Sequence, residues 1–156
     1  LGYPESSALI ARPLQDYSLT SCASHDYRKR RGTPMTAEDL RVHSCLAFAY
    51  PAGDDGRAAD KRWKLTGSEG VREIPVSGPM IVNSSPALRQ AALAGMGIAM
   101  LPDVLISEDL QAGKLIPLLQ AYRPPSRPMW LMYAQDRYRL PKVRHFVESV
   151  LAAWGR

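Results

Sequence analysis

Three small polar residues, Asn83, Ser84 and Ser85, stand immediately before Pro86 near the middle of the chain. Asparagine and serine are favoured at helix N-caps, and proline is favoured at the first helical position. The segment therefore predicts a helix N-terminus, where unpaired backbone N–H groups and the positive end of the helix dipole favour an anion. Two interpretations stay open: a site for a small ligand, and a plain N-cap without a ligand.

Two glycines beyond this segment, Gly95 and Gly97, form a G-x-G pattern at the wrong end of the predicted helix for nucleotide binding. A dinucleotide-binding fingerprint has its glycines after a strand and before a helix. Here the helix comes first, and a predicted strand at residues 98–101 follows. We therefore interpret Gly95 as a left-handed helix C-cap and Gly97 as part of a tight turn.

Residue types used in catalysis are present, but they do not form catalytic patterns. The sequence has no G-x-S-x-G nucleophile elbow, and its three histidines show no metal-ligand spacing such as H-E-x-x-H. His25 and Asp26 are adjacent, but neighbours on a helix do not face each other. We expect no catalytic residue, no metal site and no cofactor.

The composition is that of a globular protein, with 156 residues of which 46% are hydrophobic and 22% charged. No run approaches the roughly 18 apolar residues of a membrane span, so we expect no membrane partner. Cys22 and Cys45 lie in or beside apolar segments and are interpreted as reduced core thiols of a cytoplasmic protein. The net charge of +5 is spread along the chain except at residues 28–31, which we interpret as a solvated helix face.

The elements that would position the polar segment alternate between strands and helices. A meander at residues 63–65, 71–76 and 80–82 is predicted to lead into the helix after Pro86, whose apolar stripe of Leu88, Ala91 and Ala92 faces away from Arg89 and Gln90. The last helix has six apolar residues on one face, at Val143, Phe146, Val147, Val150, Leu151 and Trp154. Further strands are predicted at residues 17–23, 45–50, 115–119 and 129–134, and further helices at 25–31, 37–42 and 104–110.

Two segments are predicted to be irregular. Residues 51–62 have two glycines and no periodicity, which indicates an exposed loop or hairpin tip. Residues 123–128 have three prolines, which favours an extended connector between two lobes.

Several segments, in this order, resemble the effector-binding domain of LysR-type transcriptional regulators. The order and spacing of these segments together carry the resemblance, because A-G-x-G-I-x-x-L-P alone would fit many α/β proteins. The segments are residues 14–27 (LQDYSLTSCASHDY), 32–40 (GTPMTAEDL), 45–48, 63–65, 82–83 and above all 91–102 (AALAGMGIAMLP), continued by GKLIPLL, YRPPSRPMWLMYA and LPKVRHFVESVL.

The resemblance implies an α/β fold of the periplasmic-binding-protein-like (type 2), two-lobed kind, with one lobe complete and the other partial. Residues 1–21 would form part of the first lobe and the first crossover, and residues 22–125 the second lobe. Residues 126–156 would form the return crossover and the C-terminal helix of the first lobe. We expect a truncated or processed product, since the chain opens at Leu1 in what resembles the middle of a fold.

The family resemblance also implies partners. A small-molecule effector, often an anion such as a carboxylate, would lie in the cleft between the lobes, and the protein would assemble as a dimer or tetramer. DNA would be contacted only through an N-terminal winged helix-turn-helix, which we expect this chain to lack. The implied effector-binding residues are Asn83, Ser84, Ser85, Gly2, Tyr3, Met100 and Pro102, with Arg12 as a counter-charge.

Two other functions remain open from the sequence. A solute-binding protein of a transport system has the same architecture, and fold alone does not separate it from a regulator. A winged-helix segment encoded upstream would indicate the regulator, and a signal peptide the transport protein. A bare oligomerisation module would differ from both, because no ligand would raise its melting temperature.

Overall fold

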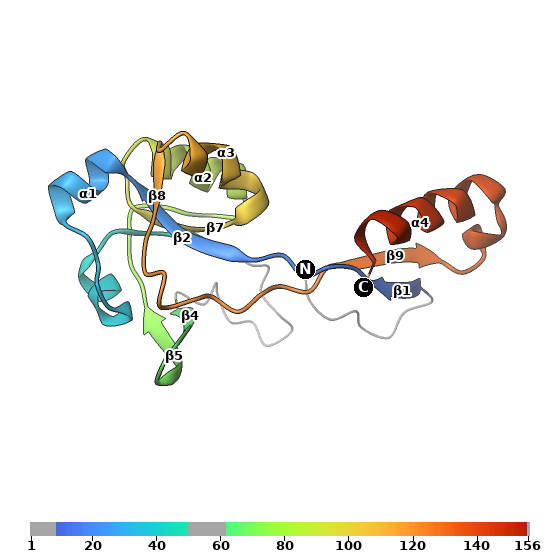
Figure 1. Cartoon of the computed structure of the whole chain (residues 1–156), viewed down its shortest axis with the longest axis horizontal. Helices are drawn as coiled ribbons and strands as arrows, with labels where there is room; N and C mark the ends of the chain where they lie inside the picture. The colour runs from blue at the N-terminus through green and yellow to red at the C-terminus, as the bar shows by residue number, and fades with distance from the viewer. Residues whose placement is uncertain (1–8, 50–61, 156) are drawn as a thin grey trace. The chain divides into compact units, whose positions relative to one another are not determined.

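The computed structural model describes residues 9–49 and 62–155. Contacts divide the chain into two compact units, which are treated separately below and are drawn in Figure 1. Unit 1 comprises Leu1–Tyr17 and Ser126–Arg156, and unit 2 comprises Ser18–Pro125. The division thus falls within the proline-rich residues 123–128. The predicted loop at residues 51–62 lies, except for its last residue, outside the described part of the chain.

Unit 2 is built on a mixed five-stranded sheet of order β6-β3-β7-β2-β8. β3 (Cys45–Phe48) runs parallel to both β6 (Ile81–Val82) and β7 (Ile98–Pro102). β2 (Leu19–Ser24) is antiparallel to β7 and to β8 (Leu115–Pro117). Parallel strands need crossover connections: α2 connects β6 to β7, whereas the segment between β3 and β6 contains a hairpin.

Each face of this sheet carries a separate apolar cluster, because side chains alternate between the two faces of a strand. α2 (Ser85–Leu93) and α3 (Asp103–Gln111) pack on one face through Leu46, Leu88, Ile106 and their neighbours. The other face packs against α1 (His25–Arg31), η1 (Ala37–Val42) and the hairpin of β4 (Arg62–Gly67) and β5 (Gly70–Pro75). Figure 1 shows α2 and α3 on one side of β2 and β7, with the hairpin on the other.

The predicted meander is wrong, although each of its strands exists. β4 and β5 pair only with each other among the named strands, and β6 joins the five-stranded sheet beside β3. The reason is a long-range contact at the point where the chain leaves the hairpin. The N–H of Cys45 donates to the carbonyl of Ser77 at 2.7 Å, which draws the chain onto the edge of β3.

η1 confirms the helix predicted after Thr36, but as a six-residue 3₁₀ helix. The Asp39 carboxylate accepts the N–H groups of Met35 and Thr36, both at 2.8 Å. These two backbone hydrogen bonds lower the pKa of Asp39, because they favour the charged carboxylate.

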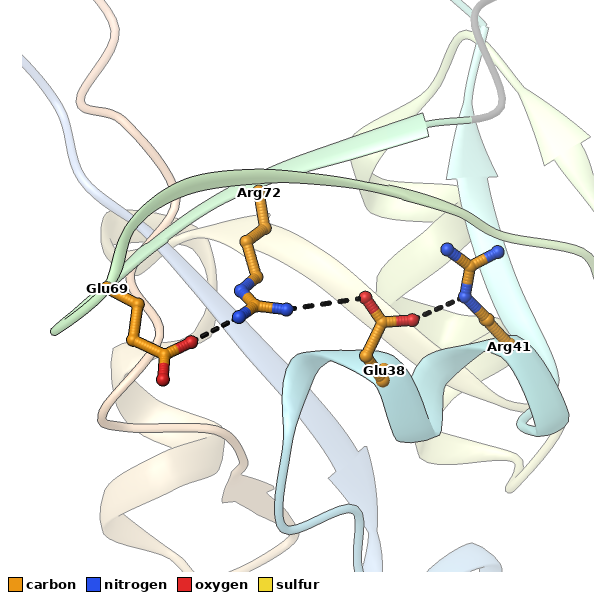
Figure 2. A network of polar contacts seen from close by, with 4 residues as sticks. All are labelled: Glu38, Arg41, Glu69 and Arg72. Carbon is orange, nitrogen blue, oxygen red and sulfur yellow. Dashed lines mark hydrogen bonds and ion pairs between the residues drawn. The ribbon is translucent and has the colours of Figure 1, made fainter.

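A chain of exposed charges connects η1 to the hairpin, as Figure 2 shows. Glu38 on η1 pairs with Arg41 at 2.5 Å and with Arg72 of β5 at 3.8 Å, and Arg72 also pairs with Glu69. Exposed pairs of this kind contribute little energy each, so the apolar cluster beneath them is the main attachment of the hairpin.

Unit 1 consists of a two-stranded antiparallel sheet and a long helix. β1 (Leu9–Pro13) pairs with β9 (Trp130–Ala134), η2 (Arg137–Arg139) follows, and α4 (Pro141–Trp154) completes the unit. The predicted last helix is confirmed, but its apolar face is only partly buried. Val147 is 2% exposed, whereas Phe146 and Trp154 are 62% and 51% exposed. Two strands are too narrow a surface to cover all six apolar side chains.

The prediction of core thiols is confirmed, since Cys22 and Cys45 are both buried and free. Burial raises the pKa of both thiols to about 12, and Asp109 and Asp103 add to the effect at Cys22. Only about one thiol in ten thousand is then ionised at about pH 8, and the thiolate is the reactive species. We expect neither cysteine of the native protein to react with a thiol reagent such as DTNB within minutes, and both to react in denaturant. Rapid labelling of the native protein would contradict the buried placement.

Candidate functional site

The polar segment of the sequence lies at the carboxyl edge of the parallel strands in unit 2. β3, β6 and β7 all end at this edge, and α2 and α3 both begin there, directly after β6 and β7. In open α/β sheets, ligands bind outside the carboxyl ends of the strands, where helix N-termini converge. The geometry therefore supports a ligand site at this edge.

The start of α2 confirms the predicted N-terminus in detail. Ser84 is the N-cap, and its hydroxyl accepts the N–H of Ala87 at 3.4 Å, while Pro86 occupies the first turn. The regular helix hydrogen bonds begin with the N–H of Leu88, which donates to Ser84 O at 3.1 Å. No acidic side chain lies in the first turn, so the positive end of the helix dipole has no counter-charge of its own there.

Asn83 and Pro102 come together at this edge through the sheet register. Val82 pairs with Phe48, and Leu46 pairs with Ala99, so the ends of β6, β3 and β7 lie level with one another. Asn83 and Pro102 are then separated by two strand spacings, about 10 Å, with Ala49 between them. That distance suits a small molecule lying along the edge. Asn83 is exposed, and Ser84, Ser85 and Pro102 are half-buried.

The other predicted site residues lie elsewhere. Met100 is two residues before the end of β7, and its side chain packs against the apolar cluster on the face opposite α2. Arg12 is an exposed residue of β1 in unit 1. Gly2 and Tyr3 lie outside the described residues. The structure thus places Asn83, Ser84, Ser85 and Pro102 at one edge of the sheet. Met100 lies nearby on β7, but its side chain is on the face opposite α2.

Sequence reasoning missed an ion pair that joins the two helices of this edge. Arg89 of α2 holds Asp109 of α3 through two bonds, Nε to Oδ2 at 2.5 Å and Nη2 to Oδ1 at 2.9 Å. The bond to Asp109 raises the pKa of Arg89, and Asp109 is only 3% exposed. A signal was available, because Asp109 follows Ile106 by three residues on the buried face of α3.

Within residues 9–49 and 62–155, no three His, Cys, Asp or Glu side chains lie close enough to bind a metal ion. None of the helices in the described ranges is long and apolar enough to span a membrane.

Comparison with known proteins gives a consistent family. The family model described as LysR substrate binding domain matches residues 1–155. The HTH-type transcriptional regulator CrgA of Neisseria meningitidis serogroup C is 32% identical over 155 residues, covering 99% of this chain and 50% of the relative. The uncharacterized HTH-type transcriptional regulator YhjC of Escherichia coli K12 is 32% identical over 145 residues, covering 90% and 46%. The chain therefore spans about half the length of these curated relatives.

Solved structures agree with the sequence comparison. The full-length Vibrio cholerae virulence activator AphB, described as a member of the LTTR protein family, superposes with a TM-score of 0.83 at 28% identity, covering 97% of this chain and 49% of that one. The regulatory domain of CrgA from Neisseria meningitidis superposes with a TM-score of 0.80 at 31% identity, covering 97% and 72%.

Proposed function

The chain belongs to the LysR substrate binding domain family, and we propose that it is the ligand-sensing regulatory part of a LysR-type transcriptional regulator. The predicted α/β, periplasmic-binding-protein-like type 2 fold is confirmed by its likeness to LTTR regulatory domains. The alternative of a solute-binding protein for transport is not supported, because the relatives and structural neighbours are transcriptional regulators. We accordingly propose a regulatory role without catalysis for the chain.

We place the effector at the carboxyl edge of the sheet in unit 2, on Asn83, Ser84, Ser85 and Pro102. The observation that carries this proposal is the α2 N-terminus, which opens at that edge without an acidic residue in its first turn. Backbone N–H groups, the helix dipole and the short side chains of Asn83 and Ser84 would favour a small carboxylate. The roles of Met100, Gly2, Tyr3 and Arg12 stay predictions that rest on the family resemblance.

In the proposed mechanism, the effector regulates the protein by binding between two lobes. Residues 22–125 would form one lobe, and residues 1–21 and 126–156 would supply the crossovers and part of the other. A ligand that binds the closed arrangement better than the open one shifts the population toward closure. In a dimer or tetramer, closure would change how the subunits pair, and so the spacing of N-terminal winged-helix DNA-binding domains. Such a regulator would act in the cytoplasm, where its DNA lies.

The proposed site predicts a specific loss of binding on changing Asn83. We expect Asn83→Ala to weaken binding of a small carboxylate about tenfold to a hundredfold, since a hydrogen bond to a charged group contributes about 1.5–3 kcal/mol. The measurement is isothermal titration of the full-length regulator with acetate, succinate and benzoate as probes. Gln90→Ala is the matched control, because Gln90 is exposed on the same helix, away from its start. Equal affinities of Asn83→Ala and the unmodified protein for a carboxylate that binds would remove Asn83 from the site.

A further inference from the structure

A short chain of buried hydrogen bonds connects three elements at one end of unit 2. Tyr27 of α1 and His43, at the end of η1, are 2% and 8% exposed, and Tyr27 Oη lies 3.0 Å from His43 Nδ1. Ser44, which leads into β3, donates its N–H to the same Tyr27 oxygen at 2.9 Å. The cluster is thus defined as Tyr27, His43 and Ser44.

The hydrogen bonds of the cluster fit a neutral imidazole. Tyr27 Oη accepts the N–H of Ser44 and keeps its own proton to donate, and His43 Nδ1 can accept that proton when the neutral imidazole carries its hydrogen on Nε2. If Nδ1 gained a proton, it would become a second donor aimed at that oxygen. The phenolic proton would then lose its acceptor inside the core, where an unsatisfied polar group is costly.

The charged groups around His43 also favour its neutral form. On α1, the Arg31 guanidinium donates to Val42 O at 3.0 Å, one residue from His43. Burial lowers the pKa of His43, Arg31 lowers it further, and Asp39 of η1 opposes them weakly. β3 contributes the Cys45 thiol, which donates to Leu40 O at 3.7 Å.

His43 also ends η1, the helix that packs against β5 of the hairpin. Its backbone N–H donates to Leu40 O at 3.3 Å as the C-cap of η1. η1 in turn packs against β5, and Glu38 reaches Arg72 across that contact, as Figure 2 shows. A disturbance at His43 would therefore loosen the end of η1, while the apolar cluster continues to hold the hairpin.

We propose that the Tyr27, His43 and Ser44 cluster is an acid-sensitive latch, which fastens the end of η1 to α1 while His43 is neutral and releases the end of η1 when His43 is protonated. The direction of the pH effect follows from the linkage between proton binding and folding. The unfolded chain binds the proton near pH 6.5, the ordinary value for histidine, and the folded chain binds it only at lower pH. The contribution to stability is therefore complete above about pH 6.5 and is lost as the pH falls below it.

The first test compares unfolding at several pH values. In urea titrations of the 156-residue chain, the unfolding equilibrium constant should rise by up to about tenfold per pH unit below about pH 6.5, beyond the rise in His43→Gln. His25→Gln is the control, since His25 is exposed on α1 and should retain the full pH dependence. Identical pH profiles for the unmodified chain and His43→Gln would overturn the latch.

The second test is local and remains informative if His43→Gln does not fold. Hydrogen exchange, corrected for the intrinsic effect of pH, should show the His43 and Ser44 amides losing about tenfold more protection than the amide of Ala99 in β7 between about pH 7.5 and 5.5. In Tyr27→Phe, nuclear magnetic resonance should show the ring of His43 titrating at a higher pH than in the unmodified chain. Protection of Ser44 that falls no more than that of Ala99, or a His43 ring that titrates at the same pH in the folded and in the urea-unfolded chain, would refute the proposal.

Discussion

Replacing Gly78 by alanine is expected to prevent unit 2 from folding, or to destabilise it by about 3 kcal/mol or more. A Cβ at this position would lie 2.0 Å from Cys45 O, 2.7 Å from Cys45 N and 2.8 Å from Cys45 C. All three are backbone atoms, so no side-chain rotation relieves the clash. Cys45 also cannot move away easily, because it begins β3, between β6 and β7 in the sheet.

The control for this prediction is Gly113→Ala. Gly113 has a left-handed φ of +66°, but a Cβ there would meet nothing within 4 Å. Its replacement should cost only about 1–2 kcal/mol, the penalty of a left-handed conformation. Urea denaturation followed by circular dichroism measures both variants against the unmodified chain. A Gly78→Ala variant as stable as Gly113→Ala would show that the backbone of β3 does not crowd Gly78.

Helices whose ends are marked by capping residues were predictable from the sequence. Ser84 and Pro86 begin α2, and Gly95, at φ +73°, ends it, because caps and left-handed turns depend only on neighbouring residues. Ser24 and Gly32 bound α1 in the same way. The helix start at the candidate site was predictable for this reason, whereas the role of its residues in binding a ligand stays a prediction.

The pairing of strands was not predictable in the same way, because it depends on contacts between distant residues. β6 has only two residues, and its partner β3 lies more than thirty residues earlier in the chain. Gly97 illustrates the same limit. It was interpreted as a tight-turn residue, but a Cβ there would lie 2.5 Å from Ser44 O, so its role is close approach to the start of β3. Two glycines, Gly78 and Gly97, thus allow neighbouring segments to reach β3.

The buried carboxylate of Asp109 on α3 was also not predicted from the sequence. Apolar periodicity places Arg89 away from the stripe of α2, which is correct, but periodicity does not identify the partner of a charged side chain. Asp109 is buried because α3 turns it toward α2, and only the packing of the two helices brings it to Arg89.

Arg89→Ala is expected to lower the melting temperature more than Asp109→Ala, by about 5–10 °C against about half of that. The asymmetry follows from burial. Removing Arg89 leaves a carboxylate whose side chain is 4% exposed, near Cys22 and without its cation. Removing Asp109 leaves a guanidinium whose side chain is 27% exposed and can turn to water.

A double-mutant cycle separates this pairing from general loss of packing. The melting temperature of Arg89→Ala with Asp109→Ala should fall by less than the sum of the two single changes, because the second change removes the carboxylate that the first one stranded. Replacing the pair by Arg89→Met with Asp109→Leu should restore most of the loss, since apolar side chains of similar volume often substitute for a buried pair. Additive effects, or a larger loss in Asp109→Ala, would show that the pair is a solvated surface contact. The outcome matters for the site because this pair joins the two helices that begin at the carboxyl edge.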